Sequence, residues 1–160
     1  MCSTCDLRRV IRATLKQLGD WSPAAENLLL GTAVQESGRN ARLREGRRLG
    51  IYRISPATHR AVWDKYLVCD PELASRVRGL AGQHCFLRDP HGELTTNLKY
   101  ATAIAWMIYR RHGSELPDAE DIAGLARHWH RHFHSRPSGS AEDFVSHYRD
   151  ATARARARAA

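Results

Sequence analysis

The sequence predicts a single, mainly α-helical domain. Hydrophobic residues recur at intervals of three and four in nearly every segment that shows a period, which is typical of helices packed on a core. Residues 100–109 carry no charge, so we expect them to form a central helix surrounded by others. The 160 residues are enough for one hydrophobic core and contain no internal repeat. Residues 39–53 leave room for a small β-hairpin at most.

Several helices can be placed by their start and stop signals. An amphipathic helix is expected from Asp6 to about Leu18. The helix that carries Glu36 follows, and Gly38 is expected to end it in the left-handed conformation. Three helices, including this one, are predicted to begin where a capping residue precedes a proline: Ser22-Pro23, Ser55-Pro56 and Asp70-Pro71.

The second half of the chain contains one predicted connection and two further helices. Residues 83–92 are expected to connect elements, because they include turn-forming residues and lack a period. Asp118 is expected to cap a helix whose apolar stripe ends at Phe133. Ser140 with Asp143 resembles a capping box that opens the last helix. We therefore expect one domain over residues 1–150 and, over residues 151–160, a frayed tail of alternating Arg and Ala.

The charge of the chain predicts attraction to a polyanion. The formal net charge is +8 and the sequence pI is about 9.9, so nucleic acid, anionic lipid and bacterial cell wall are all candidate partners. No stretch is apolar enough to span a membrane. The N-terminal residues lack a basic region followed by an apolar core, so no secretory signal is expected and the chain should be made in a bacterial cytoplasm.

Cysteine and histidine residues raise the question of a metal site. Cys2 and Cys5 form one C-x-x-C pair, and the alternative is a zinc site that they form with Cys69 and either Cys85 or His84. Only the first pair has ligand-like spacing, so reduced thiols are the preferred interpretation. Four alternate histidines form pairs at helical spacing, but the helix already uses its apolar face for the core. We predict neither a metal nor a cofactor. The four histidines are His128, His130, His132 and His134.

Glu36 is the candidate catalytic residue. It shares a helical face with Leu29 and Ala33, a spacing that points the carboxylate toward apolar surroundings. Partial desolvation and the unpaired carbonyls at the helix C-terminus both favour the protonated acid, and a protonated carboxylic acid can donate its proton to a leaving group. The alternative is an ordinary glutamate in a last helical turn that faces water.

Three short motifs follow one another in a fixed order: Glu36-Ser37-Gly38, Gly50-Ile51-Tyr52-Arg53-Ile54 and Asn97-Leu98-Lys99-Tyr100-Ala101. In this respect the chain resembles the soluble lytic transglycosylases of the lysozyme-like superfamily, and their phage-type members in particular. The resemblance covers residues 28–134. It implies a lysozyme-like helical fold and cleavage of the β-1,4 bond between N-acetylmuramic acid and N-acetylglucosamine in peptidoglycan.

The resemblance also implies a mechanism that needs a single carboxylate. Glu36 would protonate the glycosidic oxygen and then take the proton of the muramic acid 6-hydroxyl, which closes a 1,6-anhydro ring. Ordinary glycosidases need two carboxylates across the bond. The nearby candidates for a second one are Glu45, Asp64 and Glu93, and none has a convincing buried setting in the sequence.

By the same resemblance, further residues would bind the glycan around Glu36. Ser37 would bind the glycan, residues 50–53 would shape the cleft floor, and four later residues would form its wall. Two positions depart from the family pattern: Arg53 stands where the family has Gln, and Phe133-His134 stand where it has a Tyr-Asn pair. The residues assigned to the floor are Gly50, Ile51, Tyr52 and Arg53, and those assigned to the wall are Asn97, Tyr100, Phe133 and His134.

The setting implied is a wall-opening protein of a phage particle, since the substrate lies outside the cytoplasm. The basic tail would then dock on other virion proteins. The alternative is a catalytically inactive, lysozyme-like member of a phage or secretion assembly. Nucleic-acid binding, suggested by the arginines of residues 39–48 and of the tail, ranks below both because no zinc-finger spacing or recognition helix accompanies them.

Overall fold

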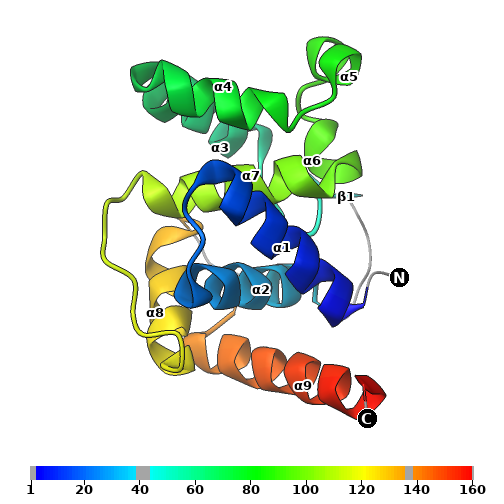
Figure 1. Cartoon of the computed structure of the whole chain (residues 1–160), viewed down its shortest axis with the longest axis vertical. Helices are drawn as coiled ribbons and strands as arrows, with labels where there is room; N and C mark the ends of the chain where they lie inside the picture. Colours follow the sequence, from blue (N-terminus) through cyan, green and yellow to red (C-terminus); the bar gives the residue numbers. More distant parts are fainter. Residues whose placement is uncertain (1–2, 39–43, 136–138, 160) are drawn as a thin grey trace.

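The computed structural model of the protein describes residues 3–38, 44–135 and 139–159. These residues form a mainly α-helical domain, as predicted, with nine α-helices and one two-stranded antiparallel hairpin among them (Figure 1). The elements are α1 (Thr4–Leu18), α2 (Pro23–Ser37), β1 (Arg44–Glu45), β2 (Arg48–Leu49), α3 (Pro56–Ala61), a π-helical turn η1 (Val62–Tyr66), a 3-10 turn η2 (Leu67–Cys69), α4 (Pro71–Gly79), α5 (Gln83–Arg88), α6 (Glu93–Thr96), α7 (Leu98–Arg110), α8 (Ile122–His132) and α9 (Ala141–Ala159).

Helix α7 is the centre of the fold. Every residue from 100 to 109 is buried, which confirms the expectation drawn from its lack of charge. Helices α1, α2, α4 and α6 and the turn η1 all contact it. In Figure 1, α3, α4 and α5 lie on one side of α7, and α2, α8 and α9 lie on the other. None of the described helices is long and apolar enough to cross a membrane.

Helix α2 is buried around most of its circumference. Its residues 28–33 are all buried, and α1, α7, α8 and α9 pack against it. At Gly31 the ring of Phe144 on α9 occupies the space that a Cβ atom would need. Because α2 is enclosed on several sides, the polar side chains at its end must find partners within the protein.

The three predicted proline-containing helix starts are confirmed. The side chain of each cap accepts a hydrogen bond from the backbone amide three residues later, and a proline follows the cap in each case. The predicted capping box is also present, because the Ser140 amide donates to Asp143 and the Asp143 amide donates to Ser140 Oγ. Local sequence therefore determines where these helices begin. The three caps are Ser22, Ser55 and Asp70.

Two predicted boundaries are wrong. Residues 83–92, expected to connect elements, contain the short helix α5, which buries none of its residues and therefore shows no apolar period. Asp118 does not cap α8. It accepts a hydrogen bond from the Glu120 amide in a local turn, and Asp121 caps the helix by accepting from the Gly124 amide.

The C-terminal residues also differ from the prediction. Residues 151–159, expected to be frayed, continue α9 as helix through Ala159. Ala and Arg are both strong helix formers, and α9 packs on α1, α2 and α8. The helical form of these residues could not be predicted from an apolar stripe, because the alternation of Arg and Ala gives neither face of the helix one.

The packing of Phe144 on Gly31 yields a prediction about stability. Gly31→Ala should lower the free energy of unfolding by about 1–3 kcal/mol, because the added methyl group overlaps a ring that is enclosed in the core. Gly79→Ala is the matched control: the new methyl group meets nothing within 4 Å, and the change should be neutral or stabilising. Urea unfolding of both variants measures the difference, and equal effects would contradict the packing described.

A second prediction concerns the buried histidine of α3. His59 is 1% exposed and lies with Nε2 2.6 Å from the Tyr100 hydroxyl and Nδ1 2.8 Å from Nδ1 of His91. Burial lowers the pKa of His59 to about 4, and the neighbouring His91 adds to the effect. His128 on α8 also has its pKa lowered to about 4, mainly by burial.

The unfolded chain protonates both rings near their ordinary pKa of 6.5 and so binds more protons than the folded state between pH 6.5 and 4. The contribution of these two histidines to the free energy of unfolding should therefore be fully present above pH 6.5 and should be lost as the pH is lowered toward 4. Thermal unfolding at intervals of half a pH unit measures this slope. His59→Gln should make the slope shallower while the part due to His128 remains, and a profile that the substitution leaves unchanged would contradict the assignment to His59.

Candidate functional site

A cleft of about 780 Å³ lies at the C-terminal end of α2. One wall comes from the end of α2, a second from the hairpin and the turn after it, and a third from the first turns of α9. We call it the Glu36 cleft. Its lining residues are Gln35, Glu36, Arg47, Arg48, Arg53, Gly139, Asp143 and His147.

Glu36 occupies the last turn of α2, and its side chain has no exposed surface. Oε1 accepts a hydrogen bond of 2.9 Å from the indole Nε1 of Trp129, and Oε2 lies 3.2 Å from Nε2 of His134. The expectation that this side chain faces the protein interior rather than water is therefore confirmed. The residue lines the cleft, but both of its oxygens are covered in this conformation.

Arg53 reaches the same end of α2 from the turn after the hairpin. Its Nε donates to the Glu36 carbonyl over 3.2 Å, so a positive charge lies at the C-terminus of α2, where the helix dipole favours it. Arg53 has a φ of 52°, a left-handed conformation that is uncommon for a residue other than glycine. Leu49 and Ile54 pair on either side of this turn and hold it in place.

Two glycines of the predicted motifs have different roles in positioning the cleft. Gly50 has a φ of 69°, and a Cβ atom there would overlap the Leu94 carbonyl, so only glycine fits. Gly38 follows α2 with a φ of 56° and a ψ of −157°, which is not the left-handed helical stop that was expected. Its amide still bonds to the Val34 carbonyl and so ends the helix.

Most of the residues assigned to the glycan by resemblance lie away from the cleft. Tyr52 is fully buried beside Thr102, and Tyr100 is fully buried beside His59. Burial raises the pKa of both phenols, which keeps them protonated. Asn97 caps α7 and donates to the Leu80 carbonyl.

Four further assigned residues differ in how near they lie to Glu36. Phe133 is 1% exposed and packs on the ring of Tyr109, whereas the next residue, His134, contacts the carboxylate. Ser37 donates to the Ala33 carbonyl, and Ile51 is half-buried beside the core. Of the residues assigned by resemblance, Arg53 and His134 are therefore the two with a described contact to Glu36.

Three residues that line the cleft or contact Glu36 were missed in the sequence. Trp129 was assigned to the core by its place in an apolar stripe, and it is fully buried, but a buried indole N–H needs an acceptor, which was the available signal. Gln35 and His147 are 112 residues apart, and Nδ1 of His147 lies 2.7 Å from Oε1 of Gln35. No local pattern connects these two residues.

Of three other acids, two are buried outside the cleft and one lines it. Glu93 is buried but accepts from the Gly82 amide and from Asn97, outside the cleft. Glu26 was not noticed in the sequence, and it is buried at the opposite end of α2. Asp143 lines the cleft, where hydrogen bonds from Ser140 lower its pKa.

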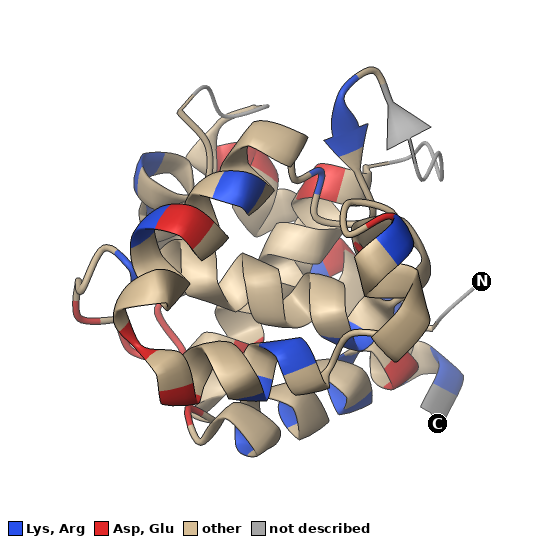
Figure 2. Cartoon of the chain, turned by 90° about the horizontal axis from the view of Figure 1, so that it is seen from above, with Lys and Arg blue, Asp and Glu red and all other residues tan. Residues whose placement is uncertain are grey.

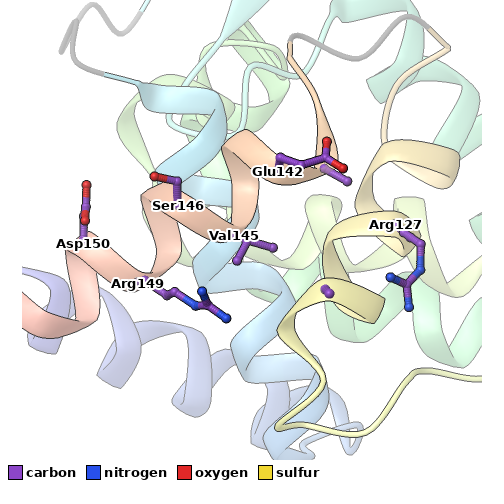
Figure 3. A pocket seen from close by; sticks show the side chains of 8 residues that line it. Arg127, Glu142, Val145, Ser146, Arg149 and Asp150 are labelled. Atoms are coloured by element: carbon purple, nitrogen blue, oxygen red, sulfur yellow. The ribbon is translucent and has the colours of Figure 1, made fainter.

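A second cavity, of about 500 Å³, lies between α8 and α9. Figure 3 shows the side chains around it, including Arg127 on α8 and Glu142, Arg149 and Asp150 on α9. Its floor is formed by small apolar side chains such as that of Val145. It contains none of the residues that contact Glu36.

The described residues contain no group of three or more His, Cys, Asp or Glu side chains placed to hold a metal ion. Cys5, Cys69 and Cys85 are free and exposed, while Cys2 lies outside the described residues. Arg39 and Arg42 of the predicted basic loop also lie outside them, whereas Arg47 and Arg48 line the cleft.

The hydrogen bond between Trp129 and Glu36 yields a prediction. Trp129→Phe should lower the free energy of unfolding by about 1–3 kcal/mol, because it leaves a buried carboxylate oxygen without its indole donor. The cost should be smaller in a Glu36→Gln background, since a bond to a neutral amide is weaker. A double-mutant cycle by urea unfolding measures the coupling.

The control for this cycle is Trp106→Phe. Trp106 donates a comparable bond of 2.8 Å to Asp20 and lies on α7 rather than on α8. Its cost should be the same with Glu or Gln at position 36. Coupling of equal size for both tryptophans would show that the Trp129 bond is not specific to the carboxylate.

Comparison of the chain with models of protein families, with curated proteins and with solved structures finds no match. The functional proposal below therefore rests on the residues of the Glu36 cleft and on the motifs in the sequence. Among these, the enclosed carboxylate at the end of α2 is the feature with the clearest chemical meaning.

Proposed function

We propose that the protein is a lysozyme-like lytic transglycosylase that cleaves peptidoglycan, with Glu36 as its catalytic acid and base. The observation that carries the proposal is the enclosed carboxylate of Glu36 in a residue that lines a 780 Å³ cleft. A carboxyl group that lines a cleft can donate a proton to a leaving group and receive one afterwards. The order of the motifs around this residue supports the same assignment.

The proposed reaction uses one protein carboxyl group in two steps. Glu36 donates its proton to the glycosidic oxygen, the bond from that oxygen to the muramic acid C1 breaks, and the substrate acetamido group stabilises the positive C1. The 6-hydroxyl oxygen of the same sugar then bonds to C1, and its proton returns to Glu36. The products are a free 4-hydroxyl on one sugar and a 1,6-anhydro ring on the other, with no water consumed.

The charges of the cleft fit an anionic polymer. Arg47, Arg48 and Arg53 line it, against the two acids Glu36 and Asp143. Peptidoglycan carries carboxylates on its lactyl and peptide groups, and guanidinium groups bind carboxylates in a well-defined geometry. The arginines would thus hold the substrate while leaving Glu36 to act on the glycosidic bond.

Substrate access requires a local change in the cleft. In the conformation described, Trp129 and His134 cover the two oxygens of Glu36, so the glycan must displace His134 to receive a proton. The same contact favours a second candidate function, in which His134 never leaves and the domain is an inactive, lysozyme-like component of a phage or secretion assembly. For the active form we propose delivery to the wall by a phage particle.

The test is digestion of purified murein sacculi, with mass analysis of the released muropeptides. The wild-type protein should release fragments with 1,6-anhydro ends, and Glu36→Gln should lower the rate by about 10²–10⁴-fold, the usual contribution of a catalytic acid or base. Glu142→Gln is the matched control, because Glu142 is an exposed acid of the separate cavity between α8 and α9. It should retain the full rate.

Each alternative gives a different product. Reducing ends in place of anhydro ends would identify a hydrolase and would direct attention to Asp143 as the second carboxylate of the cleft. Absence of fragments from the folded wild-type protein would favour the inactive assembly component. Fragments released equally by wild type and Glu36→Gln would remove Glu36 from the mechanism.

A further inference from the structure

A third cavity, of about 680 Å³, lies where the first and last helices of the chain meet. Figures 1 and 2 both show the two termini on one side of the molecule. We call this cavity the α1–α9 groove. It is lined by fifteen residues, and the argument below uses Arg8, Arg12, Trp21, Glu120, Arg149 and Arg156.

Trp21 gives the groove an exposed aromatic surface. The residue is 40% exposed, one of three large hydrophobic residues in the described chain that are exposed. Its orientation is set by the bond from Nε1 to Glu26, and the charged ends of Arg12 and Lys16 lie 5.8 Å and 5.3 Å from its ring centroid. An indole held in this way is a rigid platform beside positive charge.

The inner side of the groove is organised by Glu26. Arg8 and Arg12 both donate to this buried carboxylate over 2.7–2.9 Å. Burial opposes ionisation, but the bonds from Arg12, Trp21 and Arg8 outweigh it and lower the pKa of Glu26 to about 2. The platform and its two arginines thus form one pre-organised unit.

The outer side is basic and comes from α9. Arg149 and Arg156 line the groove, and the exposed Arg154 and Arg158 continue the positive charge along the helix. None of these four forms an ion pair with another described residue. The helical form of residues 151–159 is what brings them beside α1, which the sequence did not predict.

The mixture of groups selects the kind of partner. Glu120 is an exposed acid within the groove. It disfavours the closely spaced phosphates of a nucleic acid more than the sparser carboxylates of a glycan, and it can accept hydrogen bonds from sugar hydroxyl or amide groups. A lipid surface is disfavoured, because Trp21 is the one exposed large hydrophobic side chain here. A sugar ring can lay its C–H face on the indole, while the arginines bind carboxylates.

We propose that the α1–α9 groove is a second binding site for peptidoglycan strands, separate from the Glu36 cleft. This inference rests on the proposed function for the identity of the polymer. Along α2, Glu26 and Glu36 are ten residues apart, which places the two sites about 15 Å from each other in the direction of the helix axis. The groove holds the domain on the polymer, and the cleft carries out the cleavage.

The test is co-sedimentation of the full chain with insoluble murein sacculi in the Glu36→Gln background, so that binding is measured without cutting. Arg156→Gln together with Arg149→Gln should weaken binding on the order of tenfold, since removal of an anchoring arginine has effects of this size. Trp21→Ala should do the same. Because Trp21→Ala also removes a bond to Glu26, the fold of this variant is checked by circular dichroism. Trp21→Phe is a second variant, which keeps an aromatic platform.

The matched control is Arg127→Gln, an exposed arginine on α8 whose side chain lies outside the groove. It should bind sacculi like the unmodified chain. If the arginine and tryptophan variants also sediment unchanged, or if the protein does not sediment with sacculi at all, the proposal is overturned. The protein could also be released from sacculi by a competitor. Release by a single-stranded oligonucleotide at a lower concentration than by soluble glycan fragments would overturn the proposal in favour of nucleic acid.

The outcome is separable from that of the proposed function. Cleavage of a soluble murein tetrasaccharide, which contains an internal bond from N-acetylmuramic acid to N-acetylglucosamine, should proceed at the wild-type rate in the groove variants with Glu36 intact. Groove-dependent binding without any release of anhydro products would leave the wall-binding groove in place and remove the transglycosylase. Release of anhydro products, with binding unaffected in the groove variants, would leave the transglycosylase in place and remove the wall-binding groove.

Discussion

The hydrogen bond from Trp129 to Glu36 is the interaction on which the site depends. It joins α8 to the last turn of α2 and satisfies one oxygen of a carboxyl group that has no exposed surface. A buried carboxylate without a donor would be costly, so the rest of the arrangement has to supply partners. His134 Nε2 lies 3.2 Å from the other oxygen, and Arg53 binds the backbone carbonyl of the same residue. The candidate acid is therefore part of the protein core as much as of the cleft.

The packing of α9 on α2 links the cleft to the rest of the fold. Two neighbouring residues of α9 are linked to the two ends of α2. His147 contacts Gln35 directly, while Tyr148 accepts a hydrogen bond from Arg8 of α1, which also donates to Glu26. Phe144 closes the space between the helices at Gly31. The Glu36 cleft and the α1–α9 groove thus share two helices, and the last nineteen-residue helix contributes to both. A change in the packing of α9 on α2 would therefore move lining residues of both sites.

Local signals in the sequence were sufficient for much of the fold and for less of the site. The capped starts at Ser22, Ser55 and Asp70 and the charge-free helix α7 could be predicted because each depends on residues close together in the chain. The helical tail could not, since it continues a helix that packs on α1, α2 and α8 and has no apolar stripe of its own. The same distinction applies to the cleft. Glu36 was identified from its helix, whereas its partner Trp129 and the pair of Gln35 with His147 depend on tertiary contacts across about a hundred residues.

The most direct test is a crystal structure of the Glu36→Gln variant with a bound murein tetrasaccharide. The account predicts that the sugar chain occupies the cleft, that His134 has moved from the side chain at position 36, and that this side chain lies within about 3.2 Å of a glycosidic oxygen. A tetrasaccharide bound elsewhere, with His134 still covering position 36, would contradict the assignment of Glu36 as the residue that acts on the glycan.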